Sequence, residues 1–368
     1  MEIFLPDNFS ISEIKYRDIS PDDRTPFEAI MKKYLRKFVL KKVLKLDRNE
    51  INSQNYQLIV NIGGKKKRFL LRKYRLLSDT SQIGFYLSLL KKFKDMGLPV
   101  SRLVEAGGGK LFVKMSDGFY CLFDFIEAGH FVPSKKGYEA IVRTIAKMHL
   151  IFNHVGNRQT TKKIGTLSRR NKAYYNVIKH YSAKDFTAMK KLIESKPQKS
   201  EVDSEILNSM PVFLQKVKEI KKHNKEMRAL PRQIIHSDLH PHNILMRGQN
   251  LKAIIDFDAL RLSEQARDVA NAIHRFGRQF IVRNPSADRK EKCRRLTDQF
   301  IKIYNSVKPI SDKEKKLMPL LVLDDFLRKI LFVLKGVYLE KNTAWESNLP
   351  KFLMAIEELD YFWPARKK

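Results

Sequence analysis

Residues 235–260 decide the interpretation of this chain, and they run IHSDLHPHNILMRGQNLKAIIDFDAL. Two acids and one amide stand out: Asp238, Asn243 five residues later, and Asp256 eighteen residues after Asp238. Two short apolar runs, joined by turn-forming residues, separate Asn243 from Asp256. This pattern predicts a β-hairpin, which returns the chain and brings Asn243 and Asp256 close together.

The three polar residues suit phosphoryl transfer. Two neighbouring oxygen ligands fit Mg²⁺, which takes one or two protein ligands and completes its shell with phosphate and water. Asp238, upstream in the same loop, can accept a proton from a hydroxyl group. Asp as base, then Asn and Asp on the metal ion, is the order of the phosphoryl-transfer template. The alternative is three solvated loop residues; the spacing and the flanking apolar runs favour the template.

The segment resembles the signature of the aminoglycoside phosphotransferase/choline kinase family, whose fold is similar to that of protein kinases. That signature is H-G-D-L-H-x-x-N-I-L, followed by I-D-F or I-D-W. Here it stands as HSDLHPHNIL at 236–245 and IDFD at 255–258. Ser237 replaces the usual glycine, which we interpret as a small change.

The resemblance implies an ATP-dependent phosphotransferase, a kinase that moves the γ-phosphoryl group of ATP to an acceptor hydroxyl. Asp238 would be the catalytic base. Asn243 and Asp256 would bind Mg²⁺ and thereby the nucleotide, and Asp258 would help to hold a second metal ion. Asp268 matches an aspartate of the family that braces the catalytic loop.

The rest of the chain predicts an α+β protein with two lobes. Strand patterns dominate residues 38–125, around one helix predicted at 78–96, and helical spacing dominates beyond Gly129. We therefore expect a two-lobed, protein-kinase-like fold. Residues 1–128 would be a nucleotide-binding N-lobe with a small antiparallel sheet and an N-terminal extension. Residues 129–368 would be a mainly helical C-lobe with the catalytic loop and the acceptor site.

Two neighbouring residues are candidates for the cation that binds the nucleotide phosphates. The family's strand lysine aligns with Arg72, and Lys73 is the alternative. Strand alternation places Arg72 and Lys73 on opposite faces of the sheet. Arginine can bind phosphate with two hydrogen bonds, but it is not equivalent to lysine.

The resemblance also places the adenine site. Residues 123–129 match the hinge between the lobes, whose backbone near Asp124 and Ile126 would pair with adenine. No G-x-G-x-x-G is present, so the polar residues 47–55 are the candidate loop over the phosphates, and Gly63-Gly64 is a hairpin turn.

The helix predicted at 78–96 departs from the family pattern. It should offer a glutamate to the phosphate-binding cation, but Tyr86 stands at that position, and only Asp79 and Asp95 are acidic between Tyr74 and Gly97. Either another residue orients Arg72, or the chain is a non-catalytic nucleotide-binding pseudokinase. A protein kinase is a third reading, but the segment after Asp258 is too short for a peptide-docking activation segment.

The charge of the chain bears on its partners. Lys and Arg number 72 against 40 Asp and Glu, which gives a net charge of +32 over 368 residues. Such an excess attracts anions, so we expect the acceptor to be a small molecule or an anionic compound. In the alternative of a polyanion-binding protein, the partner would be RNA or an anionic lipid surface. Solvated helix faces explain the basic clusters as well, and no nucleic-acid-binding module is recognised.

Other classes are disfavoured by composition. Two cysteines exclude a disulfide scaffold and fit a reducing compartment, so we expect a cytoplasmic protein. The first residues show no basic segment followed by an apolar core, so we expect no secretory signal. No apolar run approaches the roughly 20 residues that span a bilayer, so we expect no transmembrane segment. His236, His240 and His242 lie at even spacing and suggest zinc, but all three belong to the kinase-like signature.

Overall fold

The computed structural model describes most of the chain. The described residues are Phe4, 16–46, 53–74, 80–170, 180–285, 288–342, Glu346 and 349–364. Two compact units emerge from the backbone contacts. The first, here called the strand unit, comprises Asp7–Phe131 and His242–Asp258; the second, the helical unit, comprises Met1–Pro6, Val132–Pro241 and Ala259–Lys368. The predicted lobe boundary between residues 128 and 129 stays a prediction.

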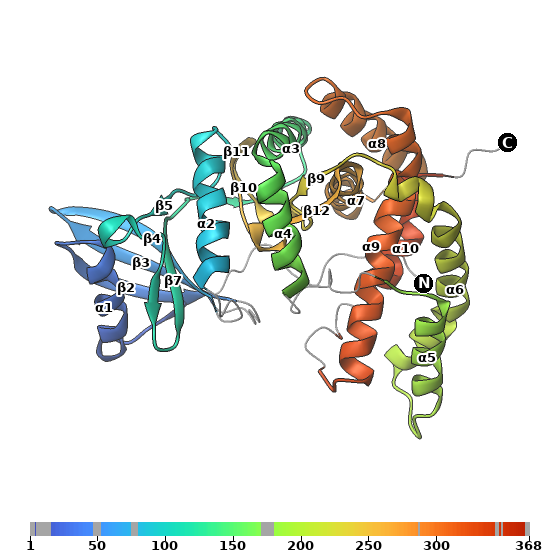
Figure 1. The fold of residues 1–368 in the computed structure, drawn as a ribbon, viewed down its shortest axis with the longest axis horizontal. Coiled ribbons are helices and arrows are strands. Elements are labelled where there is room, and N and C mark those ends of the chain that lie inside the picture. Colours follow the sequence, from blue (N-terminus) through green and yellow to red (C-terminus); the bar gives the residue numbers. More distant parts are fainter. Residues whose placement is uncertain are drawn as a thin grey trace. The chain divides into compact units, whose positions relative to one another are not determined.

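An antiparallel sheet is the centre of the strand unit (Figure 1). Its described strands are β1 (Tyr16–Asp18), β2 (Val39–Leu46), β3 (Ser53–Ile62), β4 (Lys65–Tyr74), β5 (Leu103–Val104), β6 (Val113–Met115) and β7 (Gly118–Asp124). They lie in the order β1-β2-β3-β4-β7-β5, with β6 paired to β7. The turn between β3 and β4 is Gly63-Gly64, and both residues have positive φ, of 56° and 78°, as a tight hairpin requires.

Two helices cover opposite faces of this sheet. Helix α1 (Thr25–Tyr34) contributes Met31 to the cluster that contains Leu71, whereas α2 (Thr80–Asp95) contributes Ile83 to the cluster against which Leu70 packs. Because successive side chains of a strand alternate, Arg72 lies on the α2 face, and the predicted separation from Lys73 is confirmed.

A second, three-stranded sheet completes the strand unit. It consists of β8 (Gly129–His130), β10 (Ile244–Arg247) and β11 (Asn250–Ile254), in the order β11-β10-β8. Strands β10 and β11 are antiparallel, and Gly248 in their turn has a φ of 59°. The hairpin predicted inside residues 235–260 is thereby confirmed.

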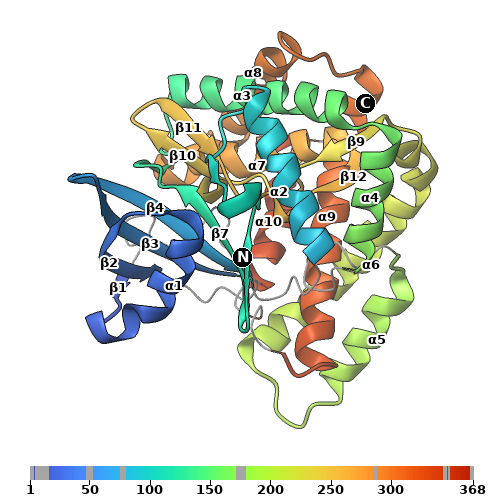
Figure 2. The ribbon, with the colours of Figure 1, turned by 60° about the vertical axis from the view of Figure 1, so that its left-hand side comes forward.

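Helices make up most of the helical unit (Figure 2). They are α3 (Lys135–Val155), α4 (Arg158–Arg170), α5 (Ala183–Glu194), α6 (Glu201–Arg228), α7 (Gln265–Arg283), α8 (Arg289–Asn305), α9 (Asp312–Tyr338) and α10 (Leu349–Phe362). A two-stranded ladder joins β9 (Arg232–Ile235) to β12 (Arg261–Glu264). Most side chains of α7 are buried, and it packs on α8, α9 and both strands of the ladder.

The α+β class is confirmed. Residues 47–52 of the candidate phosphate loop lie outside the described residues. The last three residues of that candidate loop, 53–55, belong to β3 rather than to a loop. Of the helical spacing expected beyond Gly129, the part at 171–179 lies outside the described residues. Helix α4 was not predicted because its sequence, RQTTKKIGTLSRR, has too few apolar residues to show a helical stripe. In the part of the chain that the structure describes, no helix is long and apolar enough to cross a bilayer.

Candidate functional site

The β10–β11 hairpin brings the two candidate metal ligands together. Ile244 lies opposite Ile254, and the N–H of Ile255 donates to the backbone oxygen of Asn243 at 2.9 Å. Asn243 and Asp256 therefore flank the same end of the hairpin, as the sequence predicts. The Asn243 side chain is buried, whereas that of Asp256 is 43% exposed and accessible to a ligand.

These two residues fit a magnesium ion. An amide oxygen and a carboxylate oxygen are hard ligands, and Mg²⁺ needs only one or two from the protein. Among the described residues, no group of three or more His, Cys, Asp and Glu side chains is arranged to hold a metal ion. A zinc site would call for such a group, but a magnesium site completed by phosphate oxygens and water does not.

Arg72 joins this set from β4. Its Nη2 lies 3.3 Å from Oδ1 of Asp256 and also makes a very short contact with Oδ2 of Asp258. Its guanidinium group sits over the ring of Tyr74, 4.9 Å from the ring centroid. The structure thus places Arg72 against the acidic residues that follow the hairpin.

Lys73, the alternative cation, has other partners. Its Nζ lies 2.5 Å from Oδ2 of Asp117 and 5.6 Å from the ring centroid of Tyr120. Arg72, which contacts Asp256, is therefore the stronger candidate for a phosphate-binding residue.

The predicted adenine-binding residues lie at the end of β7. Arg102 donates to the two carboxylate oxygens of Asp124 at 2.7 and 3.1 Å, and the Ser101 hydroxyl donates to the backbone oxygen of Asp124 at 2.6 Å. Ile126 follows two residues later and is half-buried. These contacts fix the backbone of this segment, and its pairing with adenine stays a prediction.

Asp238 lies in the helical unit, after β9. Its side chain is 31% exposed, and Oδ2 is 3.4 Å from Nε2 of His240. Burial opposes ionisation of this carboxyl, but attraction to His240, a hydrogen bond with His240, and attraction to Lys329 and His236 outweigh that effect and hold the pKa of Asp238 well below its ordinary value. Asp238 is therefore a carboxylate throughout the neutral range.

Asp268 on α7 holds the segment that carries Asp238. Its Oδ2 accepts from the N–H of His236 at 2.7 Å, and its Oδ1 accepts from the N–H of Ser237 at 2.8 Å. The predicted bracing of this loop by Asp268 is confirmed. A buried carboxylate with several donors is a strong anchor because its hydrogen bonds are charge-assisted.

A chain of buried side chains supports Asp268 in turn. Nε2 of His149 lies 3.2 Å from Asp268, Nδ1 of His149 lies 2.7 Å from the Tyr304 hydroxyl, and Gln265 donates to that hydroxyl at 2.9 Å. Since Nε2 faces a carboxylate, we assign the ring proton to Nε2, and Nδ1 then accepts from Tyr304. Neither His149 nor Tyr304 is among the site residues predicted from the sequence, and no local signal marks Tyr304.

Ser237 adopts a left-handed backbone conformation, with a φ of 73°. The replacement of glycine is therefore not the small change that we expected, because a left-handed conformation costs a residue with a Cβ atom about 1–2 kcal/mol. Asp256 shares this feature, with a φ of 64°. Backbone strain at two candidate site residues is typical of functional sites.

Ser237→Gly is expected to stabilise the protein by up to about 1 kcal/mol, because relief of the strain exceeds the extra entropy of glycine in the unfolded chain. Urea denaturation would measure the free energy of unfolding. The matched control is Ser209→Gly inside α6, which should destabilise by about 0.5–1 kcal/mol. A Ser237→Gly protein that is less stable than the wild type would contradict the assignment of strain.

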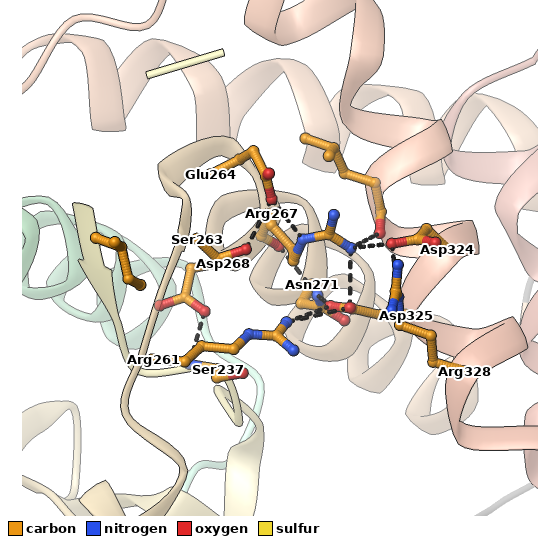
Figure 3. A network of polar contacts seen from close by, with 12 residues as sticks. Ser237, Arg261, Ser263, Glu264, Arg267, Asp268, Asn271, Asp324, Asp325 and Arg328 are labelled. Carbon is orange, nitrogen blue, oxygen red and sulfur yellow. Dashed lines mark hydrogen bonds and ion pairs between the residues drawn. The ribbon is translucent and has the colours of Figure 1, made fainter. Parts of the chain in front are cut away.

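A buried ionic network lies beside Asp268 (Figure 3). Arg267 is at its centre: Nε contacts Glu264 at 3.0 Å, and Nη1 contacts Asp324 at 2.8 Å and Asp325 at 2.9 Å. Further arginines pair with the same acids: Arg261 with Asp325, Arg328 with Asp324, and Arg232 with Glu264 at 3.8 Å. These ion pairs join β9, β12, α7 and α9.

The network shifts the ionisation of its members. Burial opposes the charge on Arg267, but Asp325, Asp324 and Glu264 outweigh it and raise the pKa of the guanidinium group well above its ordinary value. Burial likewise opposes ionisation of Glu264, and Arg267 nevertheless lowers the pKa of that carboxyl to about 2. All three acids are therefore ionised at neutral pH, and each depends on a neighbouring arginine.

Sequence comparison places the chain among phosphotransferases. The profile of the phosphotransferase enzyme family (APH) matches residues 45–291, which is more than half of the chain. A homoserine kinase from Zymomonas mobilis is 23% identical over 222 residues, which are 60% of this chain and 60% of that protein. The match thus spans less than two thirds of the length of this relative. Neither match supports the predicted RNA or anionic-surface partner.

Solved structures share the fold. An aminoglycoside phosphotransferase from Alicyclobacillus acidocaldarius has a TM-score of 0.61 and 14% identity, over 91% of this chain and 93% of its own. The spectinomycin phosphotransferase APH(9)-Ia, in complex with ADP and spectinomycin, has a TM-score of 0.61 and 14% identity, over 88% of this chain and 93% of its own. At such identities the likeness shows the fold alone.

Proposed function

Since the chain belongs to the phosphotransferase enzyme family (APH), we propose that it is an ATP-dependent kinase that phosphorylates a hydroxyl group of a small molecule. The β10–β11 hairpin carries this proposal, because it places Asp256 beside Asn243 and in contact with Arg72. One amide, one carboxylate and one cation are the metal- and phosphate-binding groups of the phosphoryl-transfer template.

Each candidate site residue of the strand unit has a proposed task. Arg72 binds phosphate oxygens of ATP, and the oxygens of Asn243 and Asp256 hold Mg²⁺. When bound, Mg²⁺ neutralises the negative charge that gathers on the phosphates in the transition state. The backbone at Asp124 and Ile126 binds the adenine base.

Asp238 acts on the acceptor. A carboxylate with a lowered pKa is a weak base, so its first task is to accept a hydrogen bond from the acceptor hydroxyl and to orient that oxygen toward the γ-phosphorus atom. As the new oxygen–phosphorus bond forms, the bond from the γ-phosphorus atom to the bridging oxygen breaks and ADP leaves, and Asp238 takes the proton of the now strongly acidic hydroxyl. Asp268 and His149 hold the loop in place for this step.

The acceptor is proposed to be small and to carry an anionic group. The relative from Zymomonas mobilis is a homoserine kinase, which supports a small hydroxyl-bearing acceptor. The net charge of +32 favours an acceptor with a carboxylate or a similar group. Homoserine is the first compound to test.

Asp256→Asn is expected to remove the magnesium-dependent part of ATP affinity, a loss of about tenfold or more, because the amide replaces the charged ligand. Asparagine is chosen because it tolerates the left-handed backbone of this position. Calorimetric titration with ATP, in Mg²⁺ and in EDTA, measures the effect. Asp117→Asn, at an exposed carboxylate of the same unit, is the control and should bind as the wild type does. A full magnesium effect in Asp256→Asn would contradict this assignment.

A further inference from the structure

The cation Arg72 is held by carboxylates that follow the hairpin, not by the neighbouring helix. In the family that the sequence resembles, a glutamate on that helix is expected to pair with the cation. Here α2 presents Tyr86, which is buried. The contacts of Arg72 run instead to Asp256 and Asp258, and Asp258 is 186 residues away in the chain.

The pair formed by Arg72 and Asp258 is well shielded from water. Their side chains are 16% and 11% exposed, whereas that of Asp256 is 43% exposed. A salt bridge that is this far buried is costly to break, because either partner left alone is an uncompensated charge. Of the two carboxylates, Asp258 is therefore the one built to hold Arg72, and Asp256 is the one that a ligand can reach.

Aromatic side chains define the surroundings of this pair. The ring of Tyr74 lies under the guanidinium group of Arg72. Burial, and next the negative charge of Asp258, raises the pKa of the Tyr86 hydroxyl, which places Tyr86 near that carboxylate. Phe257, the neighbour of Asp258, packs on Phe93 of α2 with 5.8 Å between ring centroids. The segment that supplies Asp258 is thus fixed to the helix that lacks the glutamate.

We propose that Asp258 is a positioning residue that takes the place of the missing helix glutamate: it aims Arg72 at the nucleotide phosphates and leaves Asp256 to hold Mg²⁺. This inference rests on the proposed kinase function. It differs from the expectation that Asp258 holds a second metal ion. It also means that one short segment, 256–258, supplies both the metal ligand and the partner of the phosphate-binding cation.

A double-mutant cycle on ATP binding tests this role. The variants are Arg72→Met, Asp258→Asn and the double variant, and ATP affinity is measured by calorimetry in Mg²⁺ and in EDTA. Each single substitution should weaken binding about 10- to 100-fold, and the double variant should be no weaker than Arg72→Met alone. Arg72→Lys repeats the cycle with the charge retained, in case Arg72→Met fails to fold.

The ion pair between Lys91 and Glu105, in the same strand unit, is the matched control. Lys91→Met and Glu105→Gln should each change ATP affinity by less than about twofold, because their side chains are 52% and 40% exposed and exposed pairs contribute little. A second readout is the rate of transfer: Asp258→Asn should raise KM for ATP and lower kcat, because a misdirected Arg72 weakens both the ground state and the transition state.

Two results would overturn the inference. One is unchanged ATP affinity in Asp258→Asn. The other is a loss that occurs only in Mg²⁺ and adds to that of Arg72→Met, which would identify Asp258 as a metal ligand. If the wild type binds ATP but transfers no phosphate to any acceptor, the proposed function fails, and the binding cycle still decides the role of Asp258.

Discussion

Replacing Asp238 with asparagine is expected to lower the rate of phosphoryl transfer about 10³-fold and to leave ATP affinity within about twofold. Asparagine has nearly the same shape, but it cannot accept the proton of the acceptor hydroxyl. The charge of Asp238 is maintained by His240, Lys329 and His236, so the wild type has this carboxylate ready at neutral pH. ATP binding is assigned to other residues, Arg72, Asn243 and Asp256, and should persist.

Steady-state kinetics and calorimetric ATP titration measure the two quantities for Asp238→Asn. Asp312→Asn, at an exposed position of the first turn of α9, is the control for a lost carboxylate in the helical unit. It should retain wild-type kinetics. Wild-type turnover in Asp238→Asn would contradict the assignment of Asp238 as the base.

The second large effect is on stability. Arg267→Met is expected to reduce the free energy of unfolding by about 3–5 kcal/mol, because it leaves Glu264, Asp324 and Asp325 buried with fewer positive partners. Methionine fills a similar volume, so the loss reports charge rather than a cavity. Chemical denaturation monitored by circular dichroism gives the free energy.

Two features distinguish this effect from general damage. The control, Arg143→Met, removes an arginine that is 46% exposed and pairs with Glu139 along one helix; it should cost less than about 1 kcal/mol. The second feature is that the stabilisation by Arg267 depends on pH in a defined direction. Arg267 lowers the pKa of Glu264 from 4.5 to about 2, so its stabilisation is present above pH 4.5 and is lost as the pH falls toward 2.

The deficit of Arg267→Met relative to the wild type should therefore shrink between pH 4.5 and pH 2. Denaturation curves at several pH values in that window show the trend. A deficit below about 1 kcal/mol at neutral pH, or one that grows on acidification, would contradict the role of Arg267 as the centre of the network.

Local sequence was enough to predict the hairpin and the proximity of its flanking residues. The turn residues and the short apolar runs lie within one stretch of the chain, so no distant contact is needed to pair β10 with β11. The faces of β4 were predictable for the same reason, since alternation along a strand places Arg72 and Lys73 on opposite sides.

Contacts between distant segments could not be predicted in this way. Tyr304 reaches His149 across 155 positions, and Asp258 reaches Arg72 across 186. Tertiary packing sets these partners, and neither residue type nor spacing marks them. The backbone of Ser237 is a different case: the missing glycine was visible in the sequence, but its left-handed conformation was not.

The central claim is that this chain transfers the γ-phosphoryl group of ATP to a small hydroxyl-bearing acceptor with the help of Asp238. The most direct measurement incubates γ-labelled ATP and Mg²⁺ with homoserine, or with 3-aminopropan-1-ol, which is homoserine without its carboxylate. We predict label on homoserine with the wild type, far less on the amino alcohol, and almost none with Asp238→Asn. Equal labelling by the wild type and Asp238→Asn, or ATP binding without labelling of these or any other small-molecule acceptor, would contradict the account.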